Sequence, residues 1–270
     1  MGPPLLASLG CSLLLAGAVP GNDAPPPAPP PPLTVLHLTA DLAVVAKPPS
    51  LPCHKLEVRS AGDGGRRRRT VAAGGAGGTE DPEDTVARRA RSTFPDAASI
   101  HLVHRLDRET SGCLIMAKSP EVRDILQSQF KGRSVERIYH AVVFGSPPST
   151  SGISTSRVKE TRDKRVRLVQ KGERGGKEAI TNWEVEEKGP IHTLVRIKID
   201  TGRRAQIRLH MGELGCPVSG DTRYGRGKAS VNRLCLHATS LGFDHPYGDR
   251  IRVDSEIPSK LISELRRKSL

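Results

Sequence analysis

Apolar residues recur along the chain in two spacings, which together predict a mixture of strands and helices. Residues 34–38 and 42–46 are rich in valine and leucine and predict two short strands joined by a turn at 39–41. Pro48 and Pro49 end the second strand, because proline lacks the N–H group that a sheet ladder uses. Further strands are predicted at residues 137–144, 193–199 and 234–241.

Three other segments carry apolar residues at the spacing of a helix. In residues 85–94 the apolar side chains fall on one face. A second helix is predicted to begin after Ser119, a good N-cap, and to stop at Gly132. A third is predicted at residues 204–214, with Gly215 as its C-terminal stop.

Composition divides the chain into one folded domain and several low-complexity segments. Residues 1–32 join an apolar, small-residue stretch to a polyproline run, and they predict a disordered extension or an upstream start chosen in error. An organelle leader is the remaining interpretation, although such leaders are Arg-rich. The domain is expected at residues 33–262, with a disordered Gly- and Arg-rich insertion at 60–84. Residues 263–270 are expected to form a basic tail.

Positive charge is concentrated in the second part of the chain. The formal net charge is +13, and residues 1–59 contribute none of it, because three Lys or Arg offset three acidic residues there. Residues 157–177, the basic segment, hold nine Lys or Arg against three acidic residues and predict a solvent-facing hairpin or loop. Such a surface favours a polyanionic partner, most simply nucleic acid, although a basic protein without such a partner has the same composition.

The remaining composition excludes several classes of chemistry. The five cysteines form no Cys-x-x-Cys pair, and no Cys or His cluster has the spacing of zinc ligands. Free thiols in a reducing compartment are therefore expected. No phosphate-binding loop or serine nucleophile elbow occurs. Aromatic residues make up only 3%, which argues against an RNA-binding sheet that stacks bases on aromatics.

The densest group of chemically active residues is HRLDRETSG, at 104–112. Two arginines, a histidine and two carboxylates fall within six residues, and Thr-Ser-Gly closes the stretch with a turn signal. Apolar residues flank it on both sides, so a charged loop between two strands is predicted. Asp107, held among cations, is suited to remain ionised and to face a substrate. The alternative is a charged surface hairpin without chemistry.

HRLDRETSG resembles the signature HRLDxxTSG of the RluA-type RNA pseudouridine synthases. Three further segments match this family in the same order and spacing, and a fourth fits its first strand and turn, so the similarity covers roughly residues 34–258. They are ERIYHAVVFG (136–145), TGRRAQIRLHMGELGCPVSGDTRYG (201–225), LCLHATSLGFDHP (234–246) and DLAVVAKPPSLPCH (41–54). Several ordered motifs are far more specific than one short match.

The resemblance implies roles for individual residues. Asp107 matches the catalytic aspartate, which either attacks C1′ or removes the C2′ proton. Arg105 matches the arginine that fills the space left by the extruded base, and Tyr139 the tyrosine packed against the uracil. Arg208 matches the arginine that pairs with the aspartate. Both Asp107 and Arg208 have apolar neighbours, where an unpaired charge is costly, so the residues also favour a mutual ion pair.

Substrate contacts are expected from the loop and from the basic segment. The candidates are His104, Arg162, Lys164, Arg165 and Arg167. A hydrogen-bonded structural histidine is the alternative for His104.

Two departures from the family pattern stand out. Ala205 replaces the histidine usual before the glutamine of the third helix, which puts the local loop packing in doubt. Residues 1–33 are too short and apolar for the S4 RNA-binding domain that many relatives carry.

The resemblance implies an α+β fold with a mixed, largely antiparallel central sheet, flanking helices and a catalytic cleft. It implies isomerisation of uridine to pseudouridine in structured ribosomal or transfer RNA, without metal or cofactor. A cytoplasmic monomer without stable membrane association is expected, or an organellar one if the N-terminal segment is a leader. The main rival is an inactive RNA-binding protein that keeps the fold. A glycosidase-like hydrolase would need a second carboxylate, for which only Glu109 is near.

Overall fold

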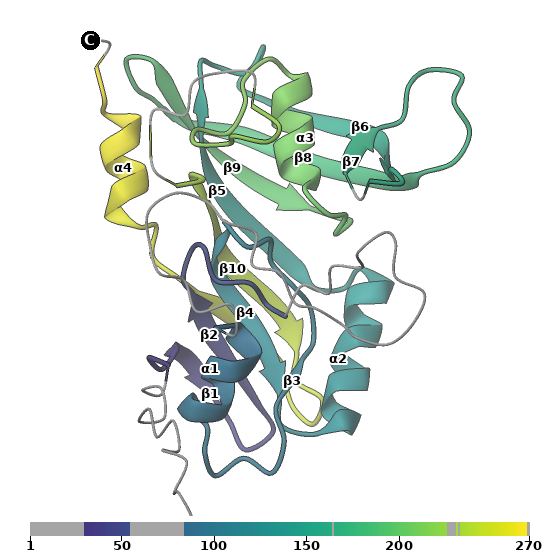
Figure 1. Cartoon of the computed structure of the whole chain (residues 1–270), viewed down its shortest axis with the longest axis vertical. Coiled ribbons are helices and arrows are strands. Elements are labelled where there is room, and N and C mark those ends of the chain that lie inside the picture. The colour runs from purple at the N-terminus through teal and green to yellow at the C-terminus, as the bar shows by residue number, and fades with distance from the viewer. Residues whose placement is uncertain (1–29, 55–83, 164, 226–230, 232, 269–270) are drawn as a thin grey trace, which may run out of the picture.

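The computed structural model describes residues 30–54, 84–163, 165–225, 231 and 233–268, and within them eleven strands form one sheet. The strands are β1 (Thr34–Leu38), β2 (Leu42–Lys47), β3 (His101–Leu102), β4 (Ser111–Ala117), β5 (Glu136–Phe144), β6 (Ser151–Glu160), β7 (Val166–Leu168), β8 (Lys177–Lys188), β9 (His192–Ile199), β10 (Leu236–Asp244) and β11 (Arg250–Asp254). Their spatial order is β1-β2-β4-β10-β5-β9-β8-β6-β7, with β3 beside β4 and β11 beside β10. Figure 1 shows this sheet extending along the long axis of the molecule.

Helices cover both faces of the sheet in the described part of the chain. They are α1 (Val86–Thr93), α2 (Pro120–Gly132), α3 (Gln206–Glu213) and α4 (Ser259–Leu265). The predicted N-cap of α2 is confirmed, because the Ser119 hydroxyl accepts the N–H of Val122 at 3.2 Å. Thr85, which was not predicted as a cap, caps α1 in the same way. The residue that ends α2 in a left-handed conformation is Arg133 (φ +63°) rather than Gly132.

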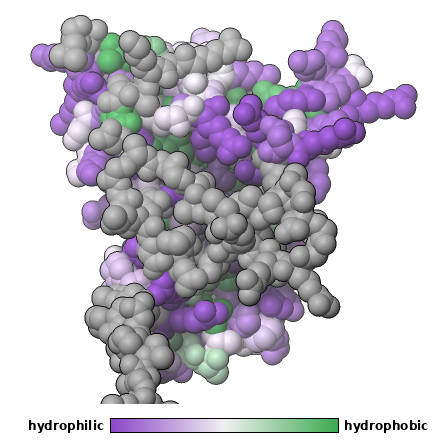
Figure 2. Space-filling view, viewed as in Figure 1, coloured by the Kyte–Doolittle hydropathy of each residue, from purple (hydrophilic) through white to green (hydrophobic). Residues whose placement is uncertain are grey.

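The predicted fold class is confirmed. Among the strands of the described residues, only β4 and β10 pair in parallel, and the other pairs are antiparallel, so the sheet is mixed and largely antiparallel. The strands predicted at 34–38, 42–46, 137–144 and 193–199 are present as β1, β2, β5 and β9. The basic segment comprises the end of β6, β7 and the loop that leads to β8. The end of β6 pairs with β7 in a hairpin, which projects as a hydrophilic arm in Figure 2.

β4 lies inside the sheet, between β2 and β10, and all seven of its residues are buried. Leu114 and Met116 enter the cluster that α1, α3 and α4 cover. Cys113 and Ile115 point to the opposite face, into a cluster with Val122 and other apolar residues of α2. A strand covered on both faces needs an unbroken apolar run, which explains why this segment shows no polar alternation.

Gly112 allows β4 to approach β10 closely. Its backbone has φ +110°, and a Cβ atom at this position would lie 2.1 Å from the carbonyl oxygen of Ala238. The Thr-Ser-Gly signal, predicted to be a turn, instead opens β4, since Ser111 and Gly112 pair with His237 and Ala238. Only glycine combines this conformation with this contact.

Three elements were not predicted from the sequence. β8 alternates buried Ala179, Thr181 and Trp183 with more exposed residues, a period-two signal that charged neighbours obscure. β11 and α4 were also missed, and α4 crosses the expected domain end at residue 262. Leu265 is fully buried, so the folded unit extends past this boundary and the expected tail at 263–270 is corrected.

The predictions for the N-terminal extension and for the insertion lie almost entirely outside the described residues and stay predictions. Within the described residues, no helix is long and apolar enough to cross a membrane.

Replacing Gly112 with alanine is expected to lower the free energy of unfolding by roughly 2–5 kcal/mol, through the clash with Ala238 and the strained φ. Gly145→Ala is the matched control, because Gly145 also has positive φ (+76°) but has open space around its Cβ position. It is expected to cost about 1 kcal/mol. Urea unfolding of both variants tests this, and equal losses would contradict the close approach of β4 and β10.

Candidate active site

A cleft of about 840 Å³ lies where the charged loop, the end of α2, β5 and the segment before α3 meet. It is lined mainly by polar and charged side chains, which include Asp107, Tyr139 and Arg208. The structure therefore brings these three residues, far apart in the chain, together around one cavity.

A buried lysine holds the backbone of the charged loop. Lys47, at the end of β2, is 1% exposed, and its Nζ donates to the carbonyl oxygens of Arg108 (2.8 Å), Leu51 (2.8 Å) and Pro48 (2.9 Å). Burial lowers the pKa of Lys47 to about 8, and nearby acidic groups oppose this effect. The ammonium group of Lys47 thus fixes the backbone of the loop next to Asp107, through its hydrogen bond to the Arg108 carbonyl.

His104 fixes the other side of the loop. Its Nε2 accepts the N–H of Ile115 at 3.2 Å, and its ring stacks on Phe130 with centroids 4.6 Å apart. Burial lowers the pKa of His104 to about 3, so the ring is neutral at physiological pH. His104 lines the cleft, but these contacts show an anchor between β4 and α2.

Tyr139 reaches the cleft through strand register. It lies opposite Ala238 of β10, and Ala238 in turn pairs with Gly112, where the charged loop ends. The side chain is 7% exposed, and burial raises its pKa to about 12, so the phenol is protonated at neutral pH.

Arg208 lies on α3 and contacts two carboxylates. Its Nη1 is 3.6 Å from Oδ2 of Asp107, an ion pair too long for a hydrogen bond. Its Nε and Nη2 each donate to Asp221 at 2.7 Å. The expected pairing with Asp107 is present, but Asp221 is the tighter partner. Sequence reasoning missed Asp221, although the aspartate of the Ser-Gly-Asp turn stands inside one of the matched motifs.

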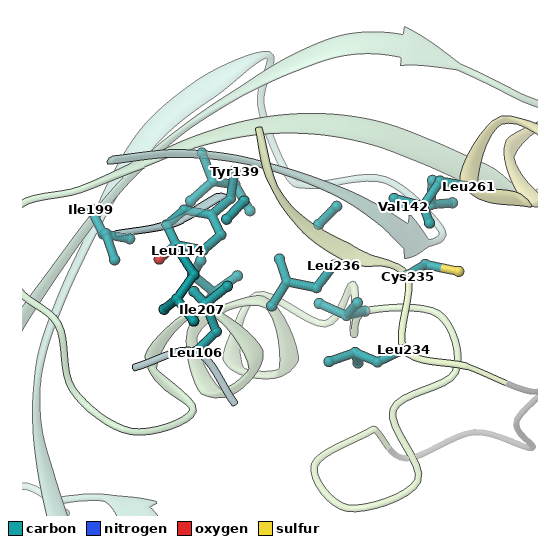
Figure 3. Close-up of a cluster of buried hydrophobic side chains, with 14 of the residues drawn as sticks. Leu106, Leu114, Tyr139, Val142, Ile199, Ile207, Leu234, Cys235, Leu236 and Leu261 are labelled. Atoms are coloured by element: carbon teal, nitrogen blue, oxygen red, sulfur yellow. The ribbon is translucent and has the colours of Figure 1, made fainter. Parts of the chain in front are cut away.

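Apolar neighbours anchor the three residues in one core. Figure 3 shows Leu106, Tyr139 and Ile207 in the same cluster of buried side chains, together with Leu114 of β4. Leu106 precedes Asp107 and Ile207 precedes Arg208, and both are buried. The packing of Leu106 and Ile207 therefore fixes the backbone positions from which Asp107 and Arg208 extend.

The segment before α3 differs from its expected form. The helix begins at Gln206, not at residue 204, because Ala205 takes a left-handed conformation (φ +54°) and gives no side-chain cap. The side chain of Gln206 compensates: its Oε1 accepts from the Thr201 hydroxyl and the Arg203 N–H, and its Nε2 donates to Ile180 and Thr181.

Known proteins match this chain along most of the described residues. The family model for RNA pseudouridylate synthases matches residues 41–213. An uncharacterised RNA pseudouridine synthase of Synechocystis is 30% identical over 251 residues, 88% of this chain and 70% of that protein. The chain belongs to this family, in its RluA-type branch.

Other relatives match shorter regions. An uncharacterised RNA pseudouridine synthase of Bacillus subtilis is 38% identical over 62% of this chain, and the ribosomal large subunit pseudouridine synthase C of Vibrio parahaemolyticus is 33% identical over 63%. Each match spans 56% of the relative's own length. The solved human RNA pseudouridylate synthase domain containing 1 has the same fold, with a TM-score of 0.66, 22% identity and 83% of both chains covered.

The expected basic contacts divide into two groups in this pseudouridine synthase fold. Arg162, Arg165 and Arg167 lie on the β6–β7 hairpin and do not line the cleft, and Lys164 lies outside the described residues. Arg167 forms a bidentate pair with Glu173 at 2.7 Å, and Arg165 pairs with Asp163 at 3.0 Å. The exposed Arg105, by contrast, lines the cleft.

Sequence reasoning missed a second set of cations around the cleft. They are Lys131, Arg133, Arg137, Arg203 and Arg204. Their signal is positional: Lys131 and Arg133 lie at the C-terminal end of α2, and Arg203 and Arg204 lie just before Ala205, the residue that precedes α3. Arg137 lies in β5. Neither pair forms a charge run that stands out in the sequence.

Ala205→Gly is expected to raise the free energy of unfolding by about 0.5–1 kcal/mol, because glycine adopts positive φ without strain. Ala97→Gly is the control: Ala97 is not among the residues with positive φ, so glycine there should destabilise by a similar amount. Chemical denaturation measures the free energy of unfolding of both variants. If both substitutions are destabilising, the backbone at Ala205 is not strained.

Proposed function

We propose that this chain isomerises uridine to pseudouridine in RNA. The observation that carries the proposal is the meeting of Asp107, Tyr139 and Arg208 at one cation-lined cleft, in a member of this family. The alternative, an RNA-binding protein without activity, would have no need for a carboxylate beside a buried guanidinium in this cleft.

The reaction breaks the bond between N1 and C1′, turns the base, and joins C5 to C1′. The hydrogen on C5 is released and N1 gains a proton, so atoms and electrons balance without a redox partner. Asp107 would act at the ribose, by attack on C1′ or removal of the C2′ proton, and both roles require an ionised carboxylate. Arg208, 3.6 Å away, supplies the compensating positive charge.

Tyr139 would pack against the uracil as a neutral phenol. Its raised pKa of about 12 makes the phenolate scarce at neutral pH, which favours packing or hydrogen-bond donation over action as a base. Arg105, exposed at the cleft, would fill the space that the flipped base leaves in the RNA.

Structured ribosomal RNA is the first candidate substrate, with transfer RNA as the alternative. The support is the excess of cations around the cleft, together with relatives named for the large ribosomal subunit. We place the protein in the cytoplasm as a monomer, or in an organelle if its first residues are a leader. The cysteines that the structure describes are free thiols, in agreement with a reducing compartment. Mapping pseudouridines across cellular RNAs with and without the gene tests the activity and identifies the uridine.

Asp107→Asn is expected to reduce turnover by roughly 10²–10⁴-fold, since the amide can neither attack nor accept a proton. RNA affinity should stay within a factor of two, because phosphate contacts supply most of it. Tritium release from C5-labelled uridine RNA measures turnover, and filter binding measures affinity. Asp124→Asn, on the exposed side of α2, is the matched control. Normal turnover in Asp107→Asn would leave the inactive RNA-binding protein as the better interpretation.

The cations of the cleft are expected to contribute more to RNA affinity than those of the hairpin, where Arg165 and Arg167 already carry acidic partners. Each phosphate contact makes the slope of log affinity against log salt concentration steeper by roughly 0.7–0.9. Replacing Lys131 and Arg203 with Gln should therefore flatten the slope by about 1.5. The same change at Arg165 and Arg167 should flatten it by less than half as much. A larger effect from the hairpin pair would place the RNA path there.

A further inference from the structure

Asp221 is a buried carboxylate whose hydrogen bonds are already in place. Its side chain is 1% exposed, and its oxygens accept from Arg208 Nε and Nη2, both at 2.7 Å. Oδ1 also accepts the backbone N–H groups of Arg223 and Tyr224, both at 2.9 Å. Burial acts to raise the pKa of Asp221, but the hydrogen bonds and charge of Arg208 outweigh it and lower the pKa.

These contacts fix the direction of the Arg208 guanidinium. Its Nε–Nη2 edge is occupied by Asp221, and its plane lies over the Tyr224 ring, with Cζ 4.8 Å from the ring centre. Nη1 faces Asp107, at 3.6 Å from Oδ2. The bidentate edge, which is the strongest way for arginine to bind a carboxylate, points away from the reacting group.

We propose that Asp221 is a positioning residue that keeps Arg208 near Asp107 while leaving the oxygens of Asp107 free to act on the nucleotide. Asp221 does not line the cleft, so it acts through Arg208 and not on the substrate. Without its charge, the Nε–Nη2 edge is free to turn to Asp107 and to occupy both oxygens with hydrogen bonds. Asp107 would then be hydrogen-bonded to Arg208 and not free to act at the ribose. This inference rests on the proposed function, since it concerns the same reaction.

Asp221→Asn tests the proposal. The amide oxygen still accepts the two backbone N–H groups, so the turn is kept while the charge that holds Arg208 is lost. Single-turnover tritium release at saturating RNA is expected to fall at least tenfold, with RNA affinity within a factor of two of the wild type. A thermal melt establishes that the variant is folded at the assay temperature. A folded variant with a rate within twofold of wild type overturns the proposal. So does a parallel loss of rate and affinity, which would indicate a general collapse of the site.

Asp221→Glu keeps the proposal testable if the Asn variant does not fold. Glutamate retains the ion pair but lengthens the side chain by one methylene, which displaces the guanidinium. A folded Glu variant is expected to lose at least tenfold in rate with unchanged affinity, whereas full turnover would show that only the charge pair matters and would overturn positioning. A wild type that releases no tritium from any RNA refutes the proposed function, and this inference with it. An active wild type with active variants refutes this inference alone.

Discussion

The parallel pairing of β4 with β10 determines where the chemically active residues meet. At Gly112 the two strands approach so closely that a Cβ atom would collide with the backbone of Ala238. Because Ala238 also pairs with Tyr139 on its other side, the end of the charged loop and the tyrosine fall in one row across three strands. The close strand pairing that Gly112 allows thus places the end of the charged loop beside the segment that carries Tyr139.

The charged residues of the site depend on apolar neighbours for their placement. A charged side chain gains little from burial, so Asp107 and Arg208 could not fix their own backbones. Leu106 and Ile207, each one residue earlier, are buried in a shared cluster, and Lys47 adds hydrogen bonds to the loop backbone. The packing of their neighbours thus sets the positions of these charged groups.

Local signals in the sequence were sufficient for the elements that carry the site. The alternation of residues 137–144 and the N-cap at Ser119 correctly predicted β5 and α2. Asp221 could not be found in this way, because its role depends on a guanidinium thirteen residues away whose orientation only the folded turn defines. Residue type likewise gave no sign that Ala205 would adopt positive φ, since alanine is an ordinary helix residue.

The cations of the cleft fall into two physical groups. Arg137 and Arg208 are buried and held in place by hydrogen bonds. Nη2 of Arg137 donates to the carbonyl oxygens of Ile199 and Asp200. Arg208 donates to the carboxylate of Asp221. Lys131 is exposed at the rim and belongs to the group that attracts phosphate over a distance. Side chains held in this way need not move when the reaction begins, so no free energy is spent on reorienting their charges toward the reacting groups. Rim charges must stay mobile to follow an irregular backbone, so salt should weaken their contribution far more than that of the buried pair.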